Sequence, residues 1–202
     1  MASTLRRLLL VMLVLSGLVP ILPASAQDAP ADPTAAYLPA AATLGDGWAL
    51  ASTGSLGLPT ELFRAGTLGV FTGPAGARIL AAVMLVTESR VAVRRSWEAA
   101  TDLFHKYSGE LAYDPDRDDI LDRLPLPAGC VEAKRIDGTA RQLGLDTGIP
   151  MGLTLCAADP DVILLVVVSG PLGHLTGYEA SDAVASLMLG AAGLPAATPT
   201  TG

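Results

Sequence analysis

Carboxylates recur at regular spacing in one short segment, residues 114–122, and this spacing is the clearest sign of chemistry in the chain. The candidate ligands are the side chains of Asp114, Asp116, Asp118 and Asp122 and the backbone carbonyl of Ile120. Oxygen atoms at positions 1, 3, 5, 7 and 9 of a loop bind Ca²⁺ in EF-hand-like sites. The pattern is incomplete, because Asp119 stands where such a loop has glycine and Pro125 where it has glutamate.

The alternative interpretation of this segment is a solvated acidic loop. In that case Asp118 or Asp119 caps a short helix that runs through Leu124. Ca²⁺ is therefore the one cofactor for which the sequence offers candidate ligands. A Ca²⁺-dependent structural module is one of three hypotheses for function.

The two histidines supply the other candidate chemistry. His105 lies within a predicted helix, and His174 lies in a glycine-containing loop. Neither has a neighbouring cysteine or a second histidine at the spacing of metal ligands, and the chain contains no Gly-x-Ser-x-Gly motif. Because catalytic triads assemble in space rather than along the sequence, an extracytoplasmic hydrolase that uses His174 is the second hypothesis. No residue is singled out as catalytic by a motif.

Cys130 and Cys156 are the two cysteines of the chain. An even number of cysteines in an exported protein predicts a disulfide. The alternative is a redox-active or metal-binding pair. That alternative lacks both the Cys-x-x-Cys spacing and a histidine close in sequence.

The N-terminus predicts export. Arg6 and Arg7 precede an apolar stretch, residues 8–19, and Ala24-Ser25-Ala26 supplies the small residues that a signal peptidase recognises. A transmembrane anchor is the alternative, but the stretch is shorter than the ~20 residues that a span needs. We therefore expect residues 1–26 to be a cleaved signal peptide, with no transmembrane span in the mature protein. The mature protein then lies in the periplasm, at the cell surface or in the medium.

The chain is acidic, with a formal net charge of −7. The predicted signal contains no acidic residue, so all of the acidic residues belong to the mature protein. Surfaces that bind nucleic acids or anionic membranes need patches of Lys and Arg. No basic run longer than Arg94-Arg95 occurs in the mature region, so we expect no nucleic-acid partner. The chain also contains no Asn, and hence no N-glycosylation acceptor.

Hydrophobic periodicity and turn residues divide the chain into a leader, one domain and a tail. Residues 27–43 are rich in Ala and Pro and predict a flexible leader, and residues 194–202 predict a disordered tail. The domain spans residues 44–193, in two halves, 44–111 and 126–193.

The first half predicts a strand after Trp48 that ends near residue 53, strands at 68–72 and 79–86, and a helix at 90–111. The second half predicts strands at 130–136, 151–158 and 162–169 and a helix that begins after Thr176 and ends before Gly193. Strands 79–86 and 162–169 have almost no polar residue, which indicates burial on both faces. Asp137-Gly138 predicts a turn.

These elements predict an α+β domain. The order and spacing of the two halves are similar, which we interpret as two β-β-β-α pseudo-repeats. Two such units would form one mainly antiparallel sheet of about six strands, with both helices on one face.

The last helix is apolar nearly all round from Ala180 to Ala192. Such a helix is usually buried on more than one side, so its outer face would meet another subunit, another domain or an apolar ligand. The alternative is an Ala- and Gly-rich surface that needs no partner. The first hypothesis for function is therefore a non-enzymatic exported domain that binds a partner protein, a second copy or a small apolar ligand. It expects substitution of Leu189 to disrupt association without unfolding the domain.

Overall fold

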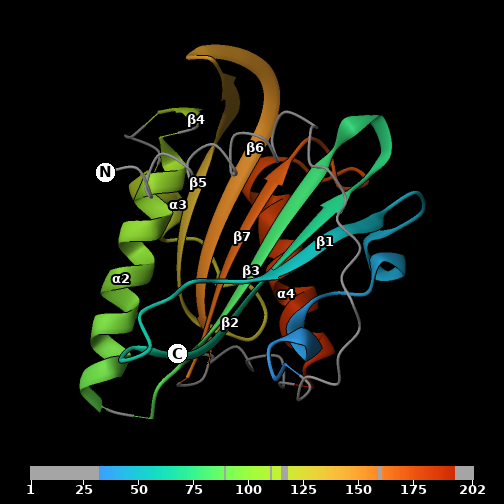
Figure 1. The fold of residues 1–202 in the computed structure, drawn as a ribbon. Helices are drawn as coiled ribbons and strands as arrows, with labels where there is room; N and C mark the ends of the chain where they lie inside the picture. Colours follow the sequence, from blue (N-terminus) through green and yellow to red (C-terminus); the bar gives the residue numbers. More distant parts are fainter. Residues whose placement is uncertain (1–31, 89, 110, 115–117, 159–160, 194–202) are drawn as a thin grey trace. The chain divides into compact units, whose positions relative to one another are not determined.

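The computed structural model describes residues 32–88, 90–109, 111–114, 118–158 and 161–193 (Figure 1). The predicted signal peptide, residues 1–26, and the predicted tail, residues 194–202, lie outside the described residues. The described chain falls within one compact unit, residues 31–202. No helix in this part of the chain is long and apolar enough to cross a membrane.

Seven strands form one sheet in which every neighbouring pair is antiparallel. The strands are β1 (Ala49–Ser55), β2 (Phe63–Thr72), β3 (Arg78–Val86), β4 (Leu111–Tyr113), β5 (Cys130–Gln142), β6 (Leu145–Ala158) and β7 (Val162–Ser169), and their order across the sheet is β1-β2-β3-β7-β6-β5-β4. The helices are α2 (Arg90–Ser108), the short α3 (Asp118–Leu121) and α4 (Gly177–Ala191). The prediction of an α+β domain with one antiparallel sheet is confirmed, and the sheet has one strand more than expected.

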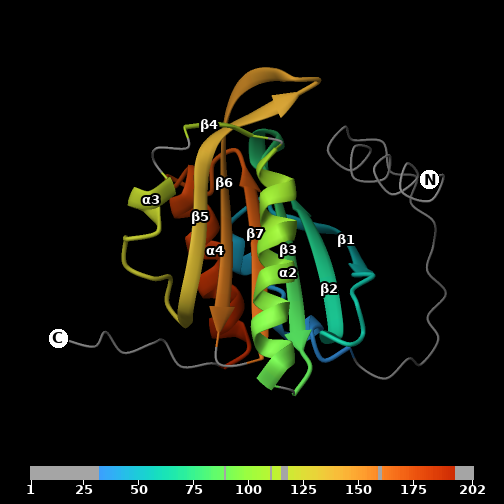
Figure 2. The ribbon, with the colours of Figure 1, turned by 90° about the vertical axis from the view of Figure 1, so that its left-hand side faces the viewer.

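β3 and β7 lie side by side in the middle of the sheet, and both are buried on both faces, as their apolar sequences predict. Ile79, Ala81 and Val83 of β3 belong to one core cluster with α4, whereas Ala82 and Met84 belong to a second cluster with α2. The two helices therefore cover opposite faces, with α2 in front of the sheet and α4 behind it in Figure 2. The prediction that both helices lie on one face is wrong.

Both halves of the domain contain the order β-β-β-α, but the helices that end them do not occupy equivalent positions. Two equivalent units that meet through antiparallel β3 and β7 would be related by a two-fold axis perpendicular to the sheet, and that axis would keep both helices on the same face. α2 and α4 lie on opposite faces, so no such axis relates the halves. The reason is the central strand pair, whose two apolar faces each need a cover.

The described part of the predicted leader, residues 32–43, is folded onto the domain rather than flexible. It contains the 3₁₀ turns η1 (Ala35–Tyr37) and η2 (Ala41–Leu44). Tyr37, Leu38 and Ala41 pack against the core cluster that contains α4. The hydroxyls of Thr34 and Thr67 both donate to the carboxylate of Asp32, which ties the segment to β2. The composition of this segment did not predict its packing, because the few side chains that anchor it are separated by Ala and Pro residues.

A disulfide joins Cys130 at the start of β5 to Cys156 of β6, as predicted, with 5.7 Å between the Cα atoms. Both cysteines are buried in the cluster beneath α4. A buried disulfide indicates an oxidising environment, as found outside the cytoplasm.

Removal of this disulfide is expected to destabilise the domain. The bond closes a loop between cysteines 26 positions apart, and such a loop restricts the unfolded chain by about 3–4 kcal/mol. The variant Cys130→Ala/Cys156→Ala should lose about this much free energy of unfolding in a urea titration, and the reduced wild-type protein should lose the same amount. Equal urea midpoints for the oxidised wild type and the variant would contradict the stabilising role.

Acidification is expected to release the N-terminal segment from β2. Hydrogen bonds from the Thr34 and Thr67 hydroxyls lower the pKa of Asp32 below 3.8. A lowered pKa means that the contact contributes its full stabilisation above the normal pKa and loses it as the pH falls through the lowered value. The Thr34 amide, which donates to Asp32 at 2.9 Å, should report this titration by NMR with a midpoint below 3.8. A midpoint at or above 3.8 would refute the contact, and Asp32→Asn should abolish the titration.

Candidate functional site

The feature that most distinguishes this domain is a projecting hairpin formed by the ends of β5 and β6. We call its outer part, residues 141–149, the arm. It extends beyond the neighbouring strands in both views of the fold (Figures 1 and 2). Its turn is Leu143-Gly144, which connects the paired residues Gln142 and Leu145. Both turn residues have positive φ, 52° and 79°, as in the tight turns of two-residue hairpins.

The arm carries three aliphatic side chains that the domain does not bury. Leu143 is 90% exposed, Leu145 73% and Ile149 46%. Single exposed leucines are common on proteins, but three exposed aliphatic residues on one projecting element make the arm a candidate interaction site.

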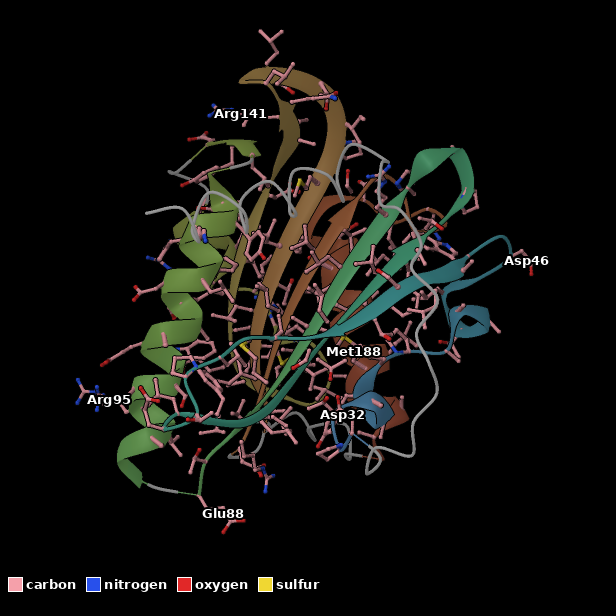
Figure 3. All side chains as sticks on the ribbon, viewed as in Figure 1. Asp32, Asp46, Glu88, Arg95, Arg141 and Met188 are labelled. Carbon is pink, nitrogen blue, oxygen red and sulfur yellow. A yellow bond between two sulfur atoms is a disulfide. The ribbon has the colours of Figure 1, made fainter. Side chains whose placement is uncertain are left out.

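Polar contacts hold the arm in its shape. The Asp146 carboxylate accepts a hydrogen bond from the Gly148 N–H at 2.9 Å, and the Thr147 hydroxyl donates to the Ala140 carbonyl at 2.7 Å. A hydrogen bond from Thr139 is the main reason that the pKa of Asp146 lies below 3.8, with the Gly148 N–H and the Arg141 charge acting in the same direction. Arg141 pairs with Asp146 across the hairpin and is labelled near the top of Figure 3.

The sequence does not predict the arm, because Asp137-Gly138 has the composition of a turn and the strand that begins at Cys130 is predicted to end at residue 136. β5 in fact continues through both residues to Gln142. Gly138 serves a different purpose, since a Cβ atom there would lie 2.4 Å from the Ala112 carbonyl oxygen of β4. A glycine inside a strand often marks a close approach of another backbone. The sequence around Gly138 is therefore compatible both with a turn and with a continuous strand that another strand approaches closely.

Below the arm, a fully buried arginine joins β5 to α4 and to the segment after α3. The Arg135 Nε–H donates to Asp182 of α4 at 2.8 Å, while its two terminal nitrogens donate to the Leu121 and Pro125 carbonyls at 2.9 and 2.7 Å. The Asp122 carboxylate accepts a hydrogen bond from the Arg135 backbone N–H at 3.1 Å. A buried guanidinium is tolerated only when it is paired in this way.

Asp182 is the centre of the same polar cluster. It also accepts a hydrogen bond from the Thr154 hydroxyl at 2.7 Å, and Thr154 contacts Ser181 at 2.8 Å. Burial raises the pKa of Asp182 above 3.8, although Thr154 and Arg135 act in the opposite direction. The cluster connects β5, β6, α4 and the end of α3, and its polar groups bond one another.

The start of α4 is stabilised by a residue of β5 rather than by a residue of its own first turn. Thr176 occupies the N-cap position, but its side chain makes no capping hydrogen bond. Asp137 of β5 instead accepts a hydrogen bond from the Tyr178 N–H at 3.2 Å. The helix start lies so close to β6 that a Cβ atom on Gly152 would come within 2.0 Å of the Gly177 carbonyl oxygen. Such a cap from a distant strand has no local sequence signal.

The predicted Ca²⁺ loop lies only partly within the described residues. Asp116 and the side chain of Asp118 fall outside them. Asp114 and Ile120 are exposed, and Asp122 bonds the Arg135 backbone. Among the described side chains, no group of three or more His, Cys, Asp or Glu residues has the arrangement of a metal site. The alternative, a short helix in this segment, agrees with α3.

The two histidines lie apart from any assembled site. His105 is exposed on α2, edge-on to the ring of Phe104 at 5.7 Å, and His174 is exposed in the loop before α4. Among the described residues neither imidazole has a hydrogen-bond partner.

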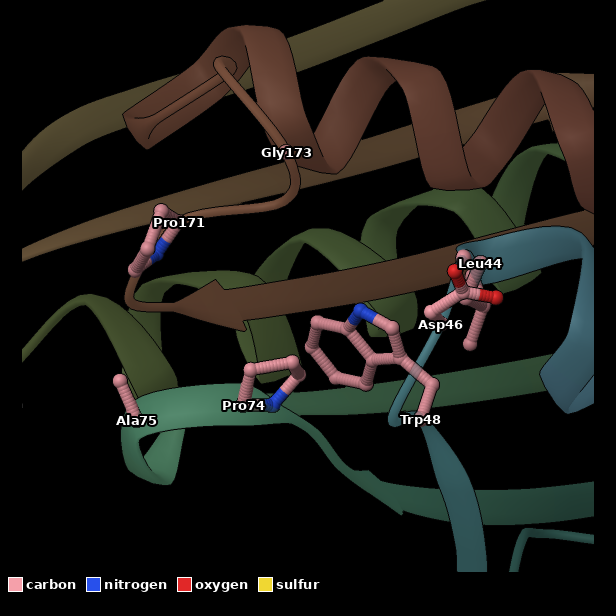
Figure 4. A pocket seen from close by; sticks show the side chains of 8 residues that line it. Leu44, Asp46, Trp48, Pro74, Ala75, Pro171 and Gly173 are labelled. Carbon is pink, nitrogen blue, oxygen red and sulfur yellow. The ribbon is translucent and has the colours of Figure 1, made fainter.

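A shallow pocket of about 240 Å³ lies beside the His174 loop (Figure 4). Its lining residues are Leu44, Gly45, Asp46, Trp48, Pro74, Ala75, Pro171 and Gly173. The indole of Trp48 lies beside Pro74 in Figure 4 and covers Gly73, where a Cβ atom would come within 2.6 Å of the ring. Asp46 is the one ionisable residue of this lining, and the volume is below the ~300–1,000 Å³ of typical ligand sites.

The apolar α4 is explained within the domain. Its residues Ala180, Val184, Met188 and Leu189 are buried against the sheet, and η1 also contacts the helix, whereas Leu187, Gly190 and Ala191 are exposed. Leu189 is 1% exposed and lies against Gly129. Leu189 is therefore a core residue and not part of the outer face of the helix, so its substitution is now expected to destabilise the domain.

Comparison with models of protein families, with curated proteins and with solved structures finds no match for this chain.

Loss of the buried arginine is expected to destabilise the domain strongly. Arg135→Ala leaves Asp182 and two carbonyl oxygens buried without their donor, which should lower the free energy of unfolding by about 3–5 kcal/mol. Arg141→Ala, on the exposed arm, is the matched control and should change it by less than about 0.5 kcal/mol. Urea unfolding measures both, and similar losses for the two variants would contradict the assignment.

Proposed function

We propose that this chain is an exported, non-enzymatic domain that binds a partner protein through its arm. The observation that carries the proposal is Leu143, whose backbone is in the left-handed conformation and whose side chain is 90% exposed. The N-terminal signal pattern in residues 1–26 and the buried disulfide support export.

The conformation of Leu143 is unfavourable for the isolated domain. An L-residue with a Cβ atom in the left-handed region costs roughly 1–2 kcal/mol, and Gly, Asn and Asp bear it best. Two-residue hairpin turns therefore favour Asn-Gly or Asp-Gly. Leu143 gains almost no burial in return for this strain. Strained backbone that is not explained by packing is a feature of functional sites, so we infer that the leucine side chain is buried in a complex.

The side chains of the arm indicate the kind of partner. Leu143, Leu145 and Ile149 present branched aliphatic surface, and the Arg141–Asp146 pair stands beside it. Apolar anchors surrounded by polar groups are the usual composition of a protein–protein interface. The partner surface would be an aliphatic pocket with a polar rim. A lipid surface is a weaker fit, because membrane-binding elements are basic and this chain is acidic.

The other two hypotheses remain predictions. A hydrolase that uses His174 would need partners for an imidazole that is exposed and unpaired among the described residues. Ca²⁺ binding would depend on residues of the 114–122 segment that lie partly outside the described chain. A small apolar ligand would have to fit the pocket beside Trp48.

Leu143→Asn separates function from stability. Asn tolerates positive φ and removes the apolar side chain, so the variant should unfold at a temperature equal to or above that of the wild type. Binding of the partner should weaken at least ~10-fold, which is a loss of about 1.4 kcal/mol. A variant that is clearly less stable than the wild type would contradict the strain argument.

Photo-crosslinking in the native cell envelope would identify the partner. A photoreactive residue replaces Leu145, and the control replaces Arg95, which points away from α2 into solvent (Figure 3). We expect a discrete protein adduct from position 145 that is absent from position 95 and is lost in Leu143→Asn. The purified partner must then show the same dependence on Leu143. Adducts of equal yield from both positions, or binding to zwitterionic vesicles without any protein adduct, would overturn the proposal.

A further inference from the structure

The strand β1, at the opposite edge of the sheet from β4, is uncovered on three sides. All seven of its residues are exposed, so neither face is covered by α2 or α4. It pairs with β2 on one side, and no strand among the described residues pairs with its outer side. Figure 2 shows it at the margin of the sheet, beyond α2.

The outward backbone groups of β1 are identified by its register with β2. The Leu56 N–H donates to the Gly66 carbonyl at 2.8 Å, in continuation of that register. Successive residues of an antiparallel strand direct their backbone groups to alternate sides. Gly54 and Ser52 therefore bond β2, and the N–H and C=O groups of Thr53 and Ser55 point away from the sheet.

β1 lacks most of the usual protection of an edge strand. Edges are normally blocked by Lys, by Pro or by strong distortion. β1 has the sequence Ala-Leu-Ala-Ser-Thr-Gly-Ser, with no charge and no proline, and a single register shift near Ala51. Its occupant is therefore an extended strand, bound by main-chain hydrogen bonds.

We infer that β1 pairs in an antiparallel fashion with β1 of a second copy of this chain. The formal net charge of −7 makes two copies repel one another. β1 is a surface on which they can meet without opposing carboxylates, and its outward groups are self-complementary under a two-fold axis. The resulting sheet would run continuously through both copies. This pairing is independent of the arm.

The dimer is a weak one. A strand of seven residues is about 24 Å long, and pairing along one such edge buries less than the ~1,200–2,000 Å² of a stable interface. Association should therefore depend on concentration, and salt should strengthen it by screening the repulsion between acidic copies.

Analytical ultracentrifugation of the mature chain from about 1 to 500 µM, the range of weak interfaces, tests the pairing. We expect a monomer–dimer equilibrium. Thr53→Pro removes an outward N–H without removing a bond to β2, and should raise the dissociation constant at least ~10-fold. Ser52→Glu places a negative charge on the pairing edge of each acidic copy and should have a similar effect. Thr53→Val, which keeps the backbone donor, should leave the constant unchanged.

Hydrogen exchange gives a reading that does not depend on variants. The Thr53 and Ser55 amides should gain protection as the concentration rises, whereas the Gly54 and Ser52 amides, already bonded to β2, should not change. Leu143→Asn should dimerise like the wild type, which keeps failure of this inference distinct from failure of the proposed function. A chain that stays monomeric throughout, or a dimer in which the Thr53 and Ser55 amides gain no protection, would overturn the inference.

Discussion

The pairing of β3 with β7 is the constraint on which the rest of this fold depends. Both strands are apolar on both faces, so the pair is stable only where each face is shielded from water. α2 covers one face and α4 the other, and the N-terminal segment extends the cover on the side of α4. The outer strands are increasingly free of this requirement, and β1 is exposed along its whole length.

The two sides of the sheet differ in how they are secured. On the side of β5 and β6, the disulfide between Cys130 and Cys156 and the ion pair between Arg135 and Asp182 join strands to one another and to α4. These contacts provide a firm base for the arm. On the side of β1, the strand pairs with β2 along one edge, and the described residues show neither a disulfide nor a buried ion pair that secures it. The arm and the β1 edge are thus two separate candidate surfaces, one made of side chains and the other of backbone groups.

Elements whose signal is local were predictable. The apolar runs of β3 and β7 and the helical periodicity of α2 identified these elements to within a few residues. Failures occurred where a local pattern competed with a distant contact. Asp137-Gly138 has the composition of a turn. Asp137 nevertheless caps α4, and the missing side chain of Gly138 allows β4 to approach closely. The arm was missed for the same reason. It begins at residue 141, beyond residue 136, where the sequence predicts the end of the strand.

The sequence by itself determined most of the strands and helices, the pairing of Cys130 with Cys156 and the acidic character of the chain, since each depends on composition or on neighbours along the chain. Only the tertiary structure decided which face each helix covers, that Arg135 is buried, and that Leu143 is exposed at a strained turn. These features depend on contacts between residues that are distant in sequence. A periodicity shows that a helix has an apolar side, but it does not show which face of the sheet that side meets.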